Sequence, residues 1–538
     1  MDKKEWINSG KTAIGIEFGS TRIKTVLAAA DGSVLAQGSH TWESHLVGGI
    51  WTYGMDEIIG GLQKSYADMA KQVENSYDIT LTKVGAIGIS AMMHGYLPFD
   101  KDGNLLTSFR TWQNTMTAQA AGELTKLFNF NIPQRWSIAH LYQAHLNGEE
   151  HVKEIAHLTT LAGFIHWRLT GERVLGIGDA SGMFPIDSTI RDYDKDMIAK
   201  FDEKIAPAGY PWKILDILPK IACAGADAGR LTKEGALLLD PKGNLQEGIL
   251  LCPPEGDAGT GMTATNSVAL RTGNVSAGTS VFAMVVLEKA LKNVYEEIDM
   301  VTTPIGDPVA MVHCNNCTSE INAWAGIFKG FLEAAGAAAD MNMVYKAIFE
   351  GALEGKPDCG GVVGCNYIAG EPVTGFVQGR PMVLRRPNAE FTFANFVRMQ
   401  LMSAVATLKL GMDILTKNES VPIDKMYGHG GYFKTPVTGQ KIMAAALGAP
   451  VSVMKTAGEG GSWGIAVLAL YSAFMAGEIG YEGIAANLPL DGFLDDVIMK
   501  GQESSTLEPD EEDVKGFAAF MENYNAMLEV EKAAVGGF

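Results

Sequence analysis

Residues 13–24 read AIGIEFGSTRIK, and this stretch decides which fold to expect. An apolar run at 13–16 is followed by a glycine-containing turn and by a second apolar run at 23–29. Two such runs around a short turn predict a β-hairpin. A further turn at 31–32 leads into a third expected strand at 33–37.

The same kind of opening recurs about half a chain downstream. The tripeptide TGN at 272–274 is a hairpin signal, and it leads through SAGTS at 276–280 into an apolar run at 281–287. Two similar openings suggest two domains of related design. We therefore expect domains at 1–265 and 266–538, and the alternation of strands and helices in each predicts an α/β class.

The composition fits a protein with a large buried core. Its 538 residues are 47% hydrophobic and 20% charged, and the formal net charge is −19. Such a charge repels nucleic acid and anionic membrane surfaces. The first eleven residues lack an apolar core, so no signal peptide is expected. The uncharged run at 460–477 is too short in its apolar part to span a bilayer and predicts a buried helix. We therefore expect a cytoplasmic protein with neither a membrane nor a nucleic-acid partner.

Six cysteines are scattered along the chain, and Cys314 and Cys317 form a CxxC pair. Cys359 and Cys365 follow, but a zinc site needs closer and more regular pairing. We expect reduced, partly buried thiols, as is typical of a cytoplasmic protein. A zinc site is the minor alternative.

The turn of the first hairpin carries groups suited to phosphate. Gly19, Ser20 and Thr21 offer backbone N–H groups and hydroxyls, and Lys24 offers a positive charge. Glu17 is a carboxylate on the same turn that is suited to holding Mg²⁺ through water. On these residues alone, a plain hairpin turn explains the stretch equally well.

A second glycine–hydroxyl turn contains Gly278 and Thr279. Such turns are common, so by itself this one indicates little. Paired with the first turn it indicates more, because two loops can grip the long phosphate chain of ATP from opposite sides.

A carboxylate stands in a third glycine-rich turn. Residues 255–261 read EGDAGTG and follow an expected strand at 249–252. Asp257 is well placed there to meet a substrate. The alternative is an Asp that caps the following helix, and without the other motifs that alternative is the better explanation.

The stretch GHGGYFKT at 428–435 resembles a P-loop, but Phe433 occupies a position that the motif reserves for glycine. A P-loop is therefore excluded. Gly430 and Gly431 instead offer bare backbone that could lie against an adenine or a ribose, and Thr435 adds a hydroxyl close behind them.

Groups suited to a sugar follow an expected strand at 84–89. Met93 and His94 come soon after it, and Trp112 and Asn114 lie farther along. Imidazole and amide groups recognise hydroxyls, and an indole ring can stack on a sugar. For His94 alone, a satisfied structural histidine is the better explanation.

Taken together and in this order, the motifs resemble those of the FGGY carbohydrate kinase family over nearly the whole chain. Residues 17–24 are similar to the family's first phosphate loop, and 277–280 to its second. Gly256-Asp257 looks like its catalytic segment. The glycines at 430–431 and the turn at 458–464 look like its adenosine side.

Two further segments add to the resemblance. Residues 179–182 read DASG, and residues 93–95 read MHG, which makes xylulokinases the members closest in look. The resemblance implies a two-lobed, actin-like ATPase fold of the ribonuclease H type, with the active site in the cleft between the lobes. It also implies an ATP- and Mg²⁺-dependent kinase that phosphorylates a hydroxyl of a small ketose or polyol, such as the ketopentose xylulose.

The resemblance also implies roles for single residues. Asp257 would accept the proton of the sugar hydroxyl, and Glu17 would hold Mg²⁺. The first domain would then contain the sugar pocket, the first phosphate loop and the catalytic Asp, and the second domain the second phosphate loop and the adenosine side. The residues expected to face the sugar, besides Asp257, are Met93, His94, Trp112 and Asn114.

Three places depart from the family's pattern. Glu17 stands where the family has Asp, and residues 112–116 read WQNTM where xylulokinases usually have Trp-x-Asp-x-Arg. Glu255 replaces a usual glycine, and its charge would raise the pKa of Asp257 if it pointed inward. A regulatory or degenerate kinase-like protein, which binds ATP without phosphorylating a sugar, is therefore the alternative. Dimers are common in the family, so a homodimer is a further hypothesis.

Overall fold

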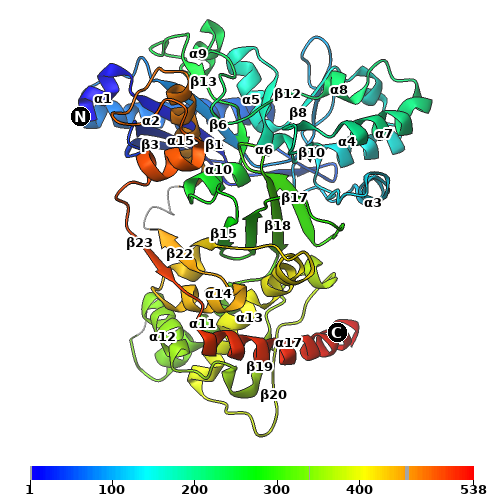
Figure 1. Cartoon of the computed structure of the whole chain (residues 1–538), viewed down its shortest axis with the longest axis vertical. Helices are drawn as coiled ribbons and strands as arrows, with labels where there is room; N and C mark the ends of the chain where they lie inside the picture. Colours follow the sequence, from blue (N-terminus) through cyan, green and yellow to red (C-terminus); the bar gives the residue numbers. More distant parts are fainter. Residues whose placement is uncertain (1–2, 339, 455–459, 538) are drawn as a thin grey trace. The chain divides into compact units, whose positions relative to one another are not determined.

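The computed structural model describes residues 3–338, 340–454 and 460–537, and Figure 1 shows it coloured along the sequence. Its contacts divide the chain into two compact units. Unit 1 comprises Met1–Val268, Met300–Val309 and Glu459–Gly501, and unit 2 comprises Ala269–Asp299, Ala310–Gly458 and Gln502–Phe538. The first change of unit lies close to the boundary expected after residue 265. The return of the chain to unit 1 near its end was not expected.

The sheet of unit 1 is built around the predicted hairpin. Its strands are β1 (Thr12–Phe18), β2 (Arg22–Ala29), β3 (Val34–Thr41), β6 (Ala86–Ala91), β13 (Leu250–Leu251) and β14 (Glu255–Gly256). β1 pairs antiparallel with β2, and β2 pairs antiparallel with β3, which confirms the three expected strands. β6 pairs parallel with β1, and β13 and β14 pair parallel with β6. Because parallel strands end at the same edge of a sheet, the residues that follow β1, β6 and β14 gather at one edge.

Two helices cover this sheet. α2 (Met55–Tyr77) packs against β2 and β3, and α15 (Gly460–Met475) packs against β1 and β6, as Figure 1 shows within unit 1. The predicted buried helix is confirmed, since α15 is buried along nearly its whole length. Close packing depends on Gly15, because a Cβ there would lie 2.0 Å from the carbonyl oxygen of Ser462.

The rest of unit 1 is a set of shorter elements. Its other helices are α1 (Lys3–Ser9), α3 (Ala118–Phe128), α4 (Ser137–Leu146), α5 (Leu161–Thr170), α6 (Ile177–Ala180), α7 (Lys195–Ile205), α8 (Ile214–Ile217), α9 (Lys233–Leu239), α10 (Asp257–Ala264) and α16 (Leu490–Phe493). Its two-stranded pairs are β4 (His45–Val47) with β5 (Ile50–Thr52), β7 (Leu97–Phe99) with β8 (His157–Thr159), β9 (Val174–Gly176) with β12 (Lys220–Ala222), and β10 (Ile186–Asp187) with β11 (Asp192–Tyr193).

The main sheet of unit 2 repeats the strand order of unit 1. Its strands are β15 (Thr272–Ala277), β16 (Val281–Val286), β17 (Ile298–Thr302), β18 (Pro308–Cys314), β21 (Lys425–His429), β22 (Val451–Met454) and β23 (Ser504–Leu507). Residues 300–302 of β17 and 308–309 of β18 are counted with unit 1 by their contacts. The order β18-β16-β15-β21-β22 corresponds to β3-β2-β1-β6-β13 in unit 1. In both units an antiparallel hairpin is followed by a parallel neighbour on the side of its first strand. The repeat inferred from the two glycine–hydroxyl turns is therefore confirmed at the level of the sheets.

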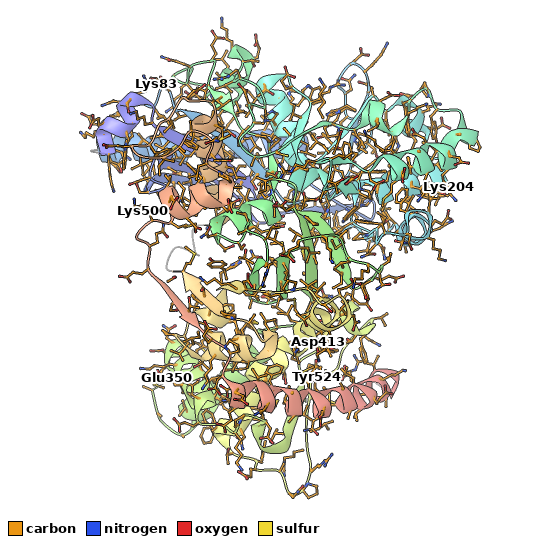
Figure 2. The ribbon with its side chains drawn as sticks, in the orientation of Figure 1. Lys83, Lys204, Glu350, Asp413, Lys500 and Tyr524 are labelled. Carbon is orange, nitrogen blue, oxygen red and sulfur yellow. The ribbon has the colours of Figure 1, made fainter. Side chains whose placement is uncertain are left out.

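Helices complete unit 2. They are α11 (Ser319–Ala334), α12 (Met341–Leu353), α13 (Phe393–Asp413), α14 (Thr438–Leu447) and α17 (Glu511–Gly537), and β19 (Val362–Cys365) pairs with β20 (Met382–Arg385). Tyr524, labelled in Figure 2, anchors α17, since its hydroxyl lies 3.0 Å from Thr407 Oγ1 of α13. The alternation of helices and strands in both units confirms the α/β class. Among the described residues, no helix combines the length and the apolar character that crossing a membrane requires.

Candidate functional site

The turn between β1 and β2 is fixed by bonds to its carbonyl groups. Trp42 Nε1–H donates to Gly19 O at 2.7 Å, and the hydroxyl of Tyr53 donates to Ser20 O at 2.7 Å. These two bonds restrain the backbone of the turn. The side chain of Thr21 is exposed, so its hydroxyl is within reach of a phosphate.

Glu17 lies at the end of β1, opposite Lys24 of β2. The N–H of Ser462 in α15 donates to Glu17 Oε2 at 3.1 Å. Burial raises the pKa of Glu17, while the charge of Lys24 and the Ser462 N–H lower it. Gly461 leaves room for the carboxyl group, because a Cβ there would lie 2.6 Å from Glu17 Oε1.

The surroundings of Glu17 fit a metal ion that arrives with a nucleotide. Within the described ranges, no three His, Cys, Asp or Glu side chains gather so as to hold a metal by themselves. A single carboxylate suits Mg²⁺, because this ion usually keeps several waters and shares its other positions with substrate phosphates.

Asp257 is the first residue of α10, and it does not cap that helix. The N-cap is Gly256, and the Asp257 Oδ1 instead accepts the N–H of Met93 at 3.2 Å. The pKa of Asp257 is raised to about 6, chiefly because the carboxyl group is surrounded by protein atoms. The bond from Met93 N–H lowers this pKa, and the charge of Glu17 raises it further. The residue is nevertheless exposed to solvent, so a substrate hydroxyl can reach it.

His94 lies in a sharp turn after β6, where its φ is 69° and that of Gly95 is 93°. Its Nδ1 lies 3.2 Å from the carbonyl oxygen of Gly182, which can only accept, so Nδ1 carries the proton. Burial lowers the pKa of His94 to about 3 and keeps the ring neutral. The Nε2 lone pair is therefore left as an acceptor for a hydroxyl. The ring also stacks on Trp136, with centroids 6.2 Å apart.

The side-chain amide of Asn114 is bonded within the protein. Its Oδ1 accepts the N–H of Trp51 at 2.9 Å, and its Nδ2 donates to Trp51 O at 2.8 Å and to Thr111 O at 3.0 Å. The amide thus holds the β4–β5 hairpin and is buried. Trp112 is 40% exposed and offers a ring surface.

Two buried carboxyl groups that received no role from the sequence lie near Asp257. Glu255 Oε2 accepts the N–H of Asp179 at 2.9 Å. Burial, and next the charge of Asp179, raise the pKa of Glu255 to about 8. Burial, and then the charge of Asp257, raise the pKa of Asp179 to about 7. The like charge that raises the pKa of Asp257 is that of Glu17, whereas Glu255 points to backbone N–H groups.

The second glycine–hydroxyl turn lies between β15 and β16 of unit 2. Gly278 O accepts the hydroxyl of Thr318 at 2.7 Å, and Thr279 O accepts the N–H of Cys317 at 2.9 Å. The CxxC pair therefore borders this turn through its backbone, and all six cysteines are free thiols. A Cβ on Gly278 would meet no atom within 4 Å, so the approach to its backbone is open.

The turn after β21 packs against the second glycine–hydroxyl turn within unit 2. Gly430 has a φ of 101°, and a Cβ there would lie 2.4 Å from the carbonyl oxygen of Ala277. Gly431 has open space around it, and Thr435 is half-buried. Phe433 is buried, and its ring lies close to Gly428. The turn expected at 458–464 lies partly outside the described residues.

The structure thus gathers Glu17, Met93, His94 and Asp257 around neighbouring strand ends of unit 1. It gathers Gly278, Thr279 and Gly430 in unit 2. Sequence reasoning missed the pairing of Glu255 with Gly178 and Asp179. The partners are 77 and 76 positions apart, and no local pattern connects them.

Two family models match the chain. The N-terminal domain of the FGGY family of carbohydrate kinases matches residues 12–242, and the C-terminal domain of the same family matches residues 273–473. A xylulose kinase from Haemophilus influenzae is 22% identical over 426 residues, which are 75% of this chain and 81% of that protein.

Solved structures share the fold. A xylulose kinase from Lactobacillus acidophilus matches 96% of this chain and 98% of its own, with a TM-score of 0.76 and 17% identity. A gluconate kinase from the same organism also matches 96% of this chain and 98% of its own, with a TM-score of 0.73 and 18% identity. These structures confirm the expected two-domain, actin-like ATPase fold. Since the family's two domains together account for most of the chain, the protein belongs to the FGGY family of carbohydrate kinases.

Proposed function

We propose that this carbohydrate kinase uses ATP and Mg²⁺ to phosphorylate a hydroxyl of a small ketose or polyol, with a ketopentose such as xylulose as the first substrate to test. One observation carries the proposal. An exposed carboxylate, Asp257, and a neutral imidazole, His94, are fixed near the ends of the paired strands β14 and β6. The first can accept a proton from a hydroxyl, and the second can accept a hydrogen bond from a neighbouring one.

Asp257 would act as the general base. Phosphoryl transfer needs little covalent help from the protein, so the base mainly positions the hydroxyl and takes its proton as the new bond forms. The Met93 N–H holds Asp257 Oδ1 at 3.2 Å and leaves Oδ2 for the substrate. His94 Nε2 would orient a second hydroxyl, and the exposed ring of Trp112 would cover a face of the sugar.

The two glycine–hydroxyl turns would bind the phosphates. Gly19 to Thr21 in unit 1 and Gly278 to Thr279 in unit 2 offer N–H groups and hydroxyls, and Lys24 adds a positive charge. Gly430 and Gly431, with Thr435, would lie on the adenosine side. Mg²⁺, when bound near Glu17, would neutralise charge on the β- and γ-phosphates.

The choice of a ketopentose rests on similarity. The relative from Haemophilus influenzae is a xylulose kinase, at 22% identity, and the MHG segment at 93–95 is similar to that of xylulokinases. Sugar choice depends on a few pocket contacts. The structure of a gluconate kinase has the same fold, so sugar acids belong in the test as well.

The test is ADP release from Mg²⁺-ATP across ketoses, aldoses, polyols and sugar acids. One sugar should stimulate release strongly, and Asp257→Asn should lower that rate about 100-fold or more while ATP still binds. Wild-type activity in Asp257→Asn would refute the role of the base. ATP binding without stimulation by any sugar would instead support the regulatory or degenerate kinase-like protein.

A further inference from the structure

Glu255 fills a slot lined by glycines. A Cβ on Gly176 would lie 2.4 Å from Glu255 Oε1, and a Cβ on Gly178 would lie 2.5 Å from Oε2. Oε1 accepts the N–H of Gly178 at 3.2 Å, and Oε2 accepts that of Asp179 at 2.9 Å. The residue is 1% exposed. Its carboxyl group therefore satisfies N–H groups in the first turn of α6 that have no partner within the helix.

The segment that Glu255 anchors continues to the sugar-facing histidine. Gly182 follows three residues after Asp179, and its carbonyl oxygen holds His94 Nδ1 at 3.2 Å. Contact is close here, because a Cβ on Gly182 would lie 2.6 Å from His94 Nδ1. The position of residues 178–182 therefore decides which nitrogen of His94 carries the proton and where Nε2 points.

Asp179, at the start of the same segment, lies beside the proposed base, Asp257. Asp179 Oδ1 would lie 3.1 Å from a Cβ placed on Gly256, the residue that precedes Asp257. The other oxygen of Asp179 accepts the hydroxyl of Thr160 at 2.7 Å. Oδ1 itself is buried and has no hydrogen-bond partner among the described residues. A shift of the segment would therefore move a carboxyl group next to the base.

We propose that Glu255 is a positioning residue of the sugar site. It anchors residues 178–182 through two backbone N–H groups and thereby orients His94 through Gly182 and holds Asp179 beside Asp257. This inference rests on the proposed function, because it assigns Glu255 to the recognition of the sugar and not of ATP.

Two variants of Glu255 test whether its bonds to the N–H groups of residues 178 and 179 act on the sugar site and not merely on the stability of the fold. Glu255→Gln keeps the size of the side chain but turns one acceptor into an NH₂ group that faces a backbone N–H. Glu255→Ala removes both acceptors. Glu419→Gln is the matched control, because Glu419 is 6% exposed and likewise accepts two consecutive N–H groups, those of Lys292 and Asn293, at 2.9 and 3.1 Å in unit 2.

The kinetic arm measures kcat and KM for ATP and for the most stimulating sugar. Both Glu255 variants should lower kcat/KM for the sugar about 10- to 100-fold, since small misplacements of reacting groups are costly, and leave KM for ATP within about twofold. Glu419→Gln should leave kcat/KM for the sugar within about twofold. Equal effects of the Glu255 variants on sugar and ATP, or no effect on either, would overturn the proposal.

The second arm needs no substrate. In protein labelled with ¹⁵N-histidine, the Nδ1–H form of His94, assigned by its loss in His94→Gln, should persist in the wild type and in Glu419→Gln. It should shift or disappear in Glu255→Gln. An unchanged His94 signal would overturn the positioning role, even if no sugar stimulates the wild type. If no sugar stimulates ADP release but the His94 signal shifts in Glu255→Gln, the proposed function is refuted, while the positioning of His94 by Glu255 is still supported.

Discussion

Asp257 has a raised pKa because protein atoms surround its carboxyl group and Glu17 adds a like charge nearby. A general base works only when it is ionised, and an Asp is ionised above its pKa. The acid limb of the pH profile should therefore lie near pH 6. It should not lie near the usual pKa of about 4 for a carboxyl group.

We accordingly expect kcat/KM for the sugar to fall about tenfold per pH unit below about pH 6. A thermal melt at each pH separates this loss from unfolding. A profile that stays flat down to pH 5 in folded protein would contradict the assignment of Asp257 as the base.

Asn114 contributes to the fold through the hydrogen bonds of its amide group. In Asn114→Asp, a carboxylate oxygen would replace the Nδ2 that donates to Trp51 O and Thr111 O. We expect a loss of about 1–3 kcal/mol in the free energy of unfolding, because oxygen would face oxygen at both contacts. Urea titration measures it, and Thr115→Asp, which adds a charge at an exposed neighbouring position, is the control. Equal stability of the two variants would show that the amide donors contribute little.

At the scale of elements, β1 and α15 approach each other so closely that only glycine fits between them. In Gly15→Ala the new Cβ would lie 2.0 Å from Ser462 O and 2.6 Å from the backbone nitrogen of Ala466. We expect a destabilisation of about 1–3 kcal/mol or more, because one of the two elements must move.

Gly60 in α2 is the contrasting case to Gly15, since a Cβ at Gly60 would meet no atom within 4 Å. Gly60→Ala should stabilise the protein by about 0.5–1 kcal/mol, because alanine loses less conformational freedom than glycine in a helix. Thermal or urea unfolding of both variants checks the pair. A destabilising Gly60→Ala, or a neutral Gly15→Ala, would contradict the described packing.

At the scale of the molecule, unit 1 is completed by a segment that follows most of unit 2 in the chain. α15 belongs to the stretch 460–501 and covers the β1 and β6 side of a sheet whose strands lie more than 200 residues before it. A fragment of residues 1–268 would expose the apolar surface that α15 buries. Unit 1 is therefore not a domain of consecutive residues.

We expect the fragment 1–268 to bind a hydrophobic dye and to melt without a cooperative transition. Joining residues 460–501 to its end should restore cooperativity, because it restores the cover of β1 and β6. A fragment 1–268 that melts cooperatively by itself would show that α15 is dispensable for the fold of unit 1.

The local elements and their chemical character could be predicted from the sequence. Alternating apolar runs around short turns predicted the hairpin of residues 13–29, and the recurrence of that opening at 272–287 predicted the second, related sheet. The apolar stretch at 460–477 predicted a buried helix. These features depend on neighbours in the chain, so they can be read without a structure, and the order of the motifs identified the family.

Contacts between groups far apart in the sequence depend on the complete fold. Ser462 donates to Glu17 across 445 positions, Asn114 holds Trp51 across 63, and Glu255 holds Gly178 across 77. A side chain with several possible partners takes the one that packing brings within about 3 Å and that burial leaves otherwise unsatisfied. That choice depends on the whole fold, which is why neither the bonds between Asn114 and Trp51 nor those between Glu255 and residues 178–179 were predicted from the sequence.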